Sequence, residues 1–135
     1  MDGKEEFQQK YREYQLLSEQ YARVQEQLQK TDEKVAQAGF VIDSITDFSK
    51  TAKGDEMLIP IADGVFARAR LLDQEELLVN VGSDVVVKKD VQSAIRMLEE
   101  QKKRIEAFRD QMADLVVRMH DKCDDLRAEL NATKV

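Results

Sequence analysis

A seven-residue repeat of apolar residues constrains the fold of this chain more than any other feature of its sequence. Near the N-terminus the repeat runs without interruption through Phe7, Tyr14, Tyr21, Leu28, Val35 and Ile42. Three places after each of these stand Lys10, Leu17, Val24, Thr31, Ala38 and Ile45, most of which are apolar. Seven residues span almost two helical turns, so residues at this spacing form a seam along one face. Sustained over this length, the seam predicts a coiled coil.

A second stretch near the other end of the chain has the same periodicity. Its first line of apolar residues is Val91, Leu98, Ile105, Met112, Met119 and Leu126. This line is supported three places on by Ala94, Phe108 and Leu115, and four places on by Ile95, Val116 and Leu130. Asp90 is placed to cap the start of this helix, and Gly54 to follow the end of the first. We therefore expect one helix over residues 4–53 and another over 90–131.

The two seams match in length and can be set in register as an antiparallel hairpin. In such a hairpin, residues at the same level have residue numbers with a constant sum. The seams meet this condition in the pairs Ile42–Leu98, Val35–Ile105, Leu28–Met112, Tyr21–Met119 and Tyr14–Leu126. We expect these pairs to form layers of one coiled coil, with the two helices packed on each other.

Residues 54–90 differ in composition from both helices, because they contain the only Pro and are rich in β-branched residues. Four short strands are predicted over residues 57–61, 65–71, 77–81 and 85–88. Asp63-Gly64 and Gly82-Ser83 separate the strands of each pair and favour tight turns. Two hairpins over residues 57–88 bury too little surface to be stable alone, so their edges need a neighbouring subunit.

Composition and charge exclude several classes of protein. The chain has 21 basic and 27 acidic residues and a net charge of -6, which disfavours a general binder of nucleic-acid backbones. No apolar run approaches the length of a membrane span, and the N-terminus does not resemble a signal peptide. The single Cys fits a reducing cytoplasm. Gly64 and Gly82 are isolated turn glycines rather than a phosphate-binding loop. We expect a cytoplasmic protein that is not an enzyme and binds no cofactor, metal, nucleic acid or membrane.

Two β-hairpins set between two long antiparallel helices resemble the alpha-class subunits of the prefoldin family. The residues that carry this resemblance are Leu58-Ile59-Pro60-Ile61, Gly64-Val65-Phe66, Leu77-Leu78-Val79-Asn80-Val81-Gly82-Ser83 and Val85-Val86-Val87-Lys88-Lys89. Val85-Val86 departs from the family pattern, in which many members have an aromatic residue there. The resemblance covers nearly the whole chain by architecture, and the compact form is most similar to archaeal alpha subunits.

The resemblance implies a single domain over residues 1–135, mainly α with a small β module. It also implies an ATP-independent chaperone subunit that assembles with beta-type subunits as a heterohexamer of two alpha and four beta chains. Such a complex holds non-native proteins and delivers them to a group II chaperonin. The oligomer interface would be formed by Leu58, Ile59, Ile61, Val65, Phe66, Leu77, Val79, Val81, Val85 and Val87.

In this family architecture, the start of the first helix and the end of the second would form client-binding tips. The tip residues of this chain are Phe7, Tyr11, Tyr14, Leu17, Met119, Leu126 and Leu130. Aromatic and Met side chains suit this task because they offer large, adaptable contact surfaces. The alternative is that these residues simply close the coiled coil, since apolar heptad positions are core positions by default.

Three further clusters have a functional and a purely structural interpretation. His120 and Cys123 could form part of a metal or thiol site, but no other ligand cluster accompanies them, so we expect a packed Cys and a solvated His. Lys102-Lys103-Arg104 is surrounded by Glu residues and is expected to be a solvated helix face. Arg68 and Arg70 lie on one strand face and would either pair with an acidic neighbouring subunit or face solvent.

A rival function remains open. A coiled-coil adaptor could use the hairpins to bind one defined partner. It would form a stoichiometric complex and have no effect on unrelated unfolded proteins, whereas a chaperone would act on many and require a second type of subunit.

Overall fold

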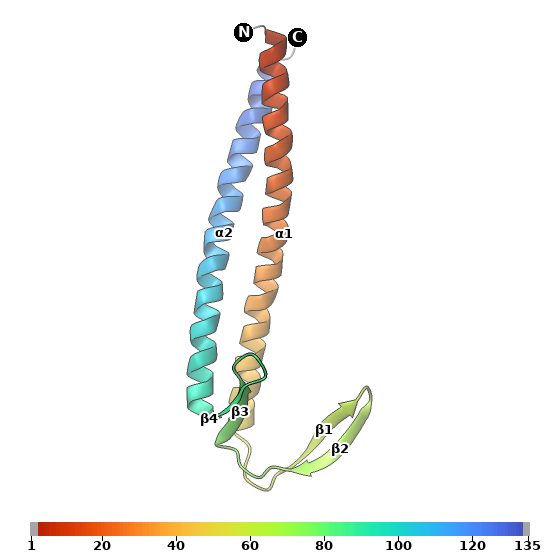
Figure 1. Ribbon diagram of the computed structural model, residues 1–135, viewed down its shortest axis with the longest axis vertical. Coiled ribbons are helices and arrows are strands. Elements are labelled where there is room, and N and C mark those ends of the chain that lie inside the picture. The colour runs from red at the N-terminus through yellow and green to blue at the C-terminus, as the bar shows by residue number, and fades with distance from the viewer. Residues whose placement is uncertain (1–2, 134–135) are drawn as a thin grey trace. The chain divides into compact units, whose positions relative to one another are not determined.

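The computed structural model describes residues 3–133 and contains two long helices with two β-hairpins between them (Figure 1). The elements are α1 (Gly3–Ser49), β1 (Glu56–Ala62), β2 (Val65–Arg70), β3 (Glu76–Asn80), β4 (Val86–Asp90) and α2 (Val91–Thr133). This order confirms the expected fold class. The described chain forms two compact units: residues 3–35 with 104–133, here called the distal unit, and residues 36–103. Within residues 3–133, neither helix has an apolar stretch that could cross a membrane.

The predicted seam of α1 is present in the structure. Every predicted position from Phe7 to Ile45 is at least half-buried, and Thr31 is the most buried, with 6% of its surface exposed. In the distal unit the two helices lie side by side in opposite directions, so that the start of α1 is beside the end of α2 (Figure 1). A long amphipathic helix is stabilised mainly by burial of its apolar face, which in α1 is this seam.

The seam of α2 follows the predicted supporting line four places on, whereas the line three places on is buried at Ala94 and exposed at Phe108 and Leu115. Its first line, from Val91 to Leu126, is buried or half-buried, and so are the residues four places on, among them Cys123 and Leu130. The expectation that Phe108 and Leu115 support the seam is wrong, because they are 53% and 39% exposed. Residues three and four places after a seam residue lie on opposite flanks of it, and at the level of Phe108 and Leu115 the flank four places on is the better buried one.

Contacts between the helices of the distal unit agree with the predicted register. The hydroxyl of Thr31 lies 3.9 Å from Met112 Sδ, and Lys10 Nζ lies 3.6 Å from a carboxylate oxygen of Glu129. Both contacts join residues within one helical turn of the predicted levels. In the distal unit, these contacts therefore agree with the antiparallel register that the sequence pattern predicts.

The second helix begins where the sequence predicts. β4 leads directly into α2, and the Asp90 carboxylate accepts a hydrogen bond of 2.7 Å from the backbone N–H of Ser93. This bond satisfies one of the free amides of the first helical turn and confirms Asp90 as the N-cap.

The first helix ends earlier than expected, at Ser49 rather than near residue 53. The hydroxyls of Ser49 and Thr51 donate to the carbonyls of Thr46 and Phe48, at 2.5 and 2.6 Å. These side chains give the last carbonyls local partners, so no glycine cap is needed. The expectation that Gly54 follows the helix end is wrong. Gly54 has φ 89° and its N–H donates to the Leu71 carbonyl at 2.7 Å, beside the first hairpin.

Each hairpin is a separate two-stranded antiparallel sheet. In the first, Met57 lies opposite Ala69 and Pro60 opposite Phe66; in the second, Val79 lies opposite Val87. β1 has one neighbour only, which leaves a free edge where Pro60 is tolerated.

Both predicted turns are present, with differences in detail. In the first, the left-handed conformation is taken by Gly64 (φ 74°) and not by Asp63. The second extends to Asp84, because Gly82, Ser83 and Asp84 all have positive φ. Val81 and Val85 therefore lie just outside the strands, joined by a hydrogen bond of 2.9 Å from the Val81 N–H.

Candidate functional site

The first turns of α1 present an aromatic pair. The rings of Phe7 and Tyr11 stack with centroids 6.3 Å apart and planes 10° from parallel. Phe7 is half-buried at the seam, whereas Tyr11 is 47% exposed. Because side chains four apart on a helix are neighbours, the pair forms a single aromatic surface whose outer part is open to a ligand.

Tyr14 is held in place by the other helix. The Arg127 guanidinium donates to the Tyr14 hydroxyl at 3.0 Å from Nη2 and 3.3 Å from Nε, and lies 5.9 Å from the ring centroid. The hydrogen bond with Tyr14 raises the pKa of Arg127 above its ordinary value. This contact orders Tyr14 between the helices, so it is less free than Tyr11 to move toward a ligand.

The remaining predicted tip residues pack mainly against the opposite helix. Met119 and Leu130 are buried, and Leu17 and Leu126 are half-buried. The structural alternative, closure of the coiled coil, therefore describes Met119 and Leu130 better than an open contact surface does. Leu16, which the sequence analysis did not single out, is 60% exposed. The signal that could have found it is a Leu outside the seam, at a position where a coiled coil usually carries a polar residue.

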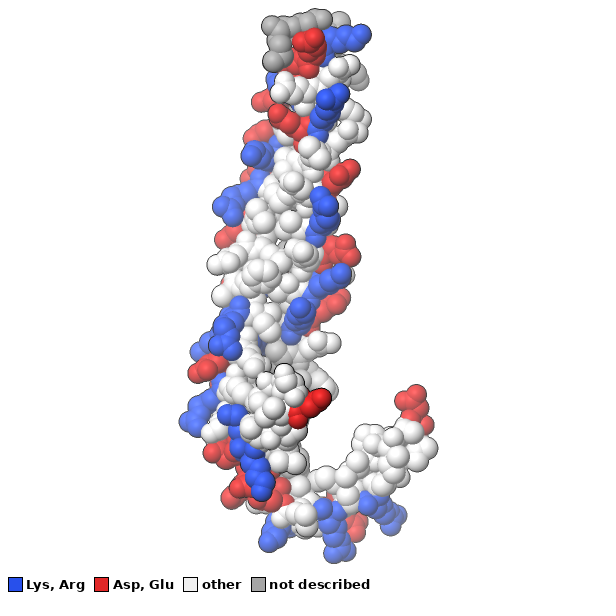
Figure 2. Space-filling view, in the orientation of Figure 1, with Lys and Arg blue, Asp and Glu red and all other residues white. Residues whose placement is uncertain are grey.

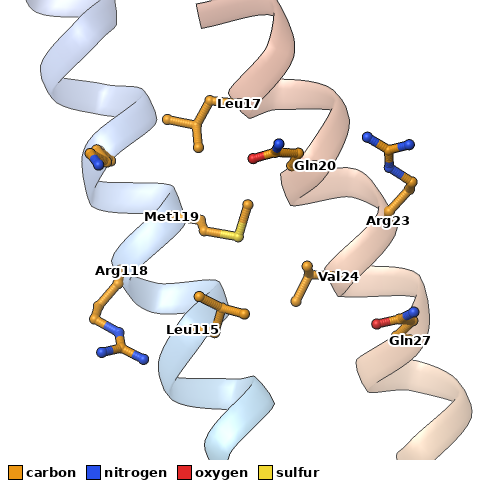
Figure 3. A pocket seen from close by; sticks show the side chains of 9 residues that line it. Leu17, Gln20, Arg23, Val24, Gln27, Leu115, Arg118 and Met119 are labelled. Atoms are coloured by element: carbon orange, nitrogen blue, oxygen red, sulfur yellow. The ribbon is translucent and has the colours of Figure 1, made fainter. Parts of the chain in front are cut away.

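A groove runs between the helices of the distal unit on one flank of the seam (Figure 3). Its volume is about 740 Å³, and side chains of both helices line it. Leu17, Val24, Leu115 and Met119 point into the space between the helices (Figure 3). The other lining residues are Gln20, Arg23, Gln27, Arg118 and Lys122. The flank where Leu115 departs from the predicted seam is thus the apolar wall of a groove.

His120 and Cys123 lie in different surroundings. Cys123 is buried in the seam with 7% of its surface exposed, whereas His120 is exposed. The His120 ring lies 5.9 Å from the ring of Tyr21, and its Nδ1 is 3.5 Å from Asp124. Within residues 3–133 no group of three or more His, Cys, Asp or Glu side chains is arranged to hold a metal ion.

The basic residues singled out from the sequence lie on exposed strand and helix faces or beside residues of their own chain. Arg70 forms an ion pair of 3.7 Å with Glu56 across the first hairpin, and Arg68 shares its exposed strand face. Lys102 is half-buried and its side chain lies near Gly39. The structure therefore pairs Arg70 within its own chain, and the predicted pairing of Arg68 with another subunit stays a prediction.

The hairpins expose most of the apolar residues predicted for oligomerisation. Leu77, Val79 and Val87 are half-buried, and exposed surface is found at Leu58, Ile59, Ile61, Val65, Phe66, Val81 and Val85. Leu78, which the sequence analysis did not assign to this surface, is 72% exposed. Exposed apolar side chains this close together are typical of an interaction surface.

Comparisons with known proteins agree with this architecture. A family model described as prefoldin subunit matches residues 4–134. The prefoldin subunit alpha of Methanobrevibacter smithii is 27% identical over 132 residues, which cover 96% of this chain and 88% of the relative. That of Methanothrix thermoacetophila is 37% identical over 95 residues, which cover 70% of this chain and 60% of the relative.

A solved structure has the same fold. A chain in the cryo-EM structure of a filamentous PFD from Methanocaldococcus jannaschii matches with a TM-score of 0.73 over 86% of this chain and 96% of that one. The sequence identity is 16%, so this likeness concerns the fold.

Proposed function

Since this chain belongs to the prefoldin family as an alpha subunit, we propose that it is part of a complex that holds non-native proteins without ATP. Prefoldins are a chaperone family without enzymatic activity, so the chain is not an enzyme. In the proposed complex two alpha chains assemble with four beta-type chains in the cytoplasm. The complex then passes its clients to a group II chaperonin.

The exposed apolar surface of the two hairpins is the observation that carries the proposed assembly. A two-stranded hairpin is at best marginally stable in water, and each of these hairpins has free edges. Pairing with strands of other subunits would remove both the edges and the apolar surface from water. The filamentous relative with this fold supports assembly, since that protein is itself an oligomer.

The exposed side chains at the start of α1 support the proposed client binding. Tyr11 and Leu16 offer apolar surface without a defined pocket, which suits weak contact with many sequences. Several subunits contacting one client at once would hold it far more tightly than one contact could.

Aggregation of two unrelated denatured proteins tests this function. The chain would be mixed with a beta-type subunit, the mass of the complex measured by light scattering, and client aggregation followed by turbidity. We expect suppression by a complex of roughly 90 kDa, six chains of about this size, 15.5 kDa. Tyr11→Ser with Leu16→Ser should weaken suppression several-fold, while Arg12→Ser on the same turns of α1 should leave it unchanged.

A stable complex that suppresses aggregation of neither client would contradict the chaperone function. It would instead support an adaptor with one defined partner. Suppression that is insensitive to Tyr11 and Leu16 would place client contact elsewhere on the complex.

A further inference from the structure

Along residues 16–34 and 104–122 of the distal unit, charged residues are separated onto two sides. The groove face is defined here as the residues of 16–34 and 104–122 at the same heptad positions as the groove-lining residues. Asp and Glu are absent from these positions, which carry the cations Arg23, Lys30, Lys34, Arg104, Arg118 and Lys122. The other positions of the same segments carry Glu19, Glu26, Asp32, Glu33, Glu106, Asp110, Asp114 and Asp121, with Arg109 as their only Lys or Arg.

The cations that line the groove are not neutralised by the chain itself. Arg23, Arg118 and Lys122 form no ion pair with any residue of the described chain, 3–133. By contrast, Arg109 on the other side pairs with Asp32 at 2.6 Å and with Asp110 at 3.2 Å. The groove is therefore a cationic surface on a protein whose net charge is -6, and its positive potential is available to a ligand.

The floor between these cations is apolar and partly open. Leu17 and Val24 are half-buried, Leu115 is 39% exposed, and Phe108 continues the apolar surface along α2. Uncharged atoms fill the strip between the helices in the space-filling view, and side chains of both charges lie along its borders (Figure 2). Such a strip fits a ligand that has apolar side chains along one line and carboxylates beside them.

We propose that the groove face binds acidic amphipathic segments of non-native proteins. Their apolar side chains contact Leu17, Val24 and Leu115, and their carboxylates pair with the groove-lining cations. This inference rests on the proposed function, to which it adds a preference among clients: acidic segments bind more tightly than basic segments of equal apolarity.

A polypeptide fits the groove better than a nucleic acid does. The apolar part of its lining consists of aliphatic side chains and Met, and the lining contains no aromatic ring on which a base could stack. The acidic residues on the remaining sides of both helices would also repel an extended polyanion.

Three labelled peptides with the same apolar residues at helical spacing test the preference. At all other positions the first peptide carries Glu, the second Gln and the third Lys, three residues with similar helix propensities. Affinity is measured by fluorescence anisotropy on the full-length chain assembled with a beta-type subunit. Exposed ion pairs are individually weak, so three of them predict about tenfold tighter binding of the Glu peptide than of the Lys peptide. The difference should shrink at about 1 M salt, where the screening length is about 3 Å.

Charge reversal of the groove provides the decisive variant. Arg23→Glu with Arg118→Glu and Lys122→Glu should invert the order, so that the Lys peptide binds more tightly. If that variant does not fold, the three Gln substitutions should remove the preference. The matched control reverses three exposed cations outside the groove, Arg12→Glu, Lys53→Glu and Lys103→Glu, with the same change in net charge. It should preserve the original order.

Four outcomes would overturn the inference. If the order of the peptides survives the reversal while client aggregation is still suppressed, the groove is not the site and the proposed function stands. If no peptide binds and no client is protected, both fail. If an oligo-dT strand displaces the Glu peptide from the groove at equal concentration, the surface is a nucleic-acid site. If the reversal alters the mass of the complex but not the order, the groove is an interface between subunits.

Discussion

Polar residues in the seam keep their hydrogen bonds within the two helices. The buried hydroxyl of Thr31 donates to the Gln27 carbonyl at 2.8 Å. Arg109, at the same level of α2, directs its guanidinium sideways to Asp32, and this hydrogen bond raises the pKa of Arg109. Both groups are satisfied, so their presence in the seam costs little. A shift in register would separate Arg109 from Asp32, so this polar layer favours the observed pairing.

Asp90 shows the effect of one residue on a helix terminus. Asp90→Ala should lower the midpoint of thermal unfolding at pH 7 by a few degrees, because the Ser93 N–H loses its acceptor. Circular dichroism melts would measure this change. Asp90→Asn is the control, since an amide oxygen accepts the same bond and does not titrate. Equal midpoints for the wild type and Asp90→Ala at pH 7 would contradict the assignment.

The same cap predicts a pH dependence. The hydrogen bonds from Ser93 hold the pKa of Asp90 below its ordinary 3.8 in the folded chain. The folded chain thus binds this proton more weakly than the unfolded chain. The stabilisation is fully present above pH 3.8 and is lost as the pH falls through the lower, folded pKa. The midpoints of wild type and Asp90→Ala should therefore converge below that range.

At the scale of the helix, the rotation of α2 about its axis decides which residues are core. Two adjacent Val residues show the difference: Val116 lies half-buried in the seam, and Val117 is 60% exposed. The heptad pattern places Val116 on a supporting line of the seam and leaves Val117 outside it. The packing of α1 against that flank of α2 gives the two residues different energetic roles.

This pair makes a matched test of the seam. Val116→Ala should destabilise the chain by about 1 kcal/mol, because it removes packed methyl groups. Val117→Ala should change stability by less than about 0.5 kcal/mol, since its side chain is exposed. Urea unfolding followed by far-UV circular dichroism gives both values. Equal losses, or a larger loss for Val117→Ala, would mean that α2 is rotated differently from the arrangement described here.

At the scale of the molecule, exposed apolar surface is found both on the hairpins and in the distal unit. We propose that the hairpin surface is covered by other subunits, whereas Tyr11, Leu16 and the groove face stay open to clients. The two kinds of surface lie in different compact units of the chain. Assembly and client capture should therefore be separable by substitution.

Two Leu→Ser substitutions test this separation. Leu58→Ser on β1 should reduce the mass of the complex formed with a beta-type subunit, because it places a polar group in the proposed interface. Leu16→Ser on α1 should leave the mass unchanged and weaken client protection. Both residues are well exposed in the single chain, at 65% and 60%, so loss of a packed core explains neither effect. Light scattering supplies the mass and turbidity the protection. Loss of assembly in Leu16→Ser would argue against the division.

Much of the fold follows from local patterns that the sequence displays directly. The heptad seam, the cap at Asp90, and the turns at Gly64 and Gly82 depend on residues near one another in the chain. These features can therefore be predicted from the sequence without a structure. The resemblance to prefoldin alpha subunits, carried by the hairpin motifs, is confirmed by the family match over residues 4–134.

Other features were decided only by tertiary packing. Phe108 and Leu115 stand at heptad spacing beside the seam, but at their level the opposite flank of α2 is the better buried one. The groove could not be assigned either, because a groove exists only where side chains of two helices meet. Periodicity specifies that a face is apolar. Which of its edges is buried and which stays open to a ligand depends on how the second helix is rotated against it.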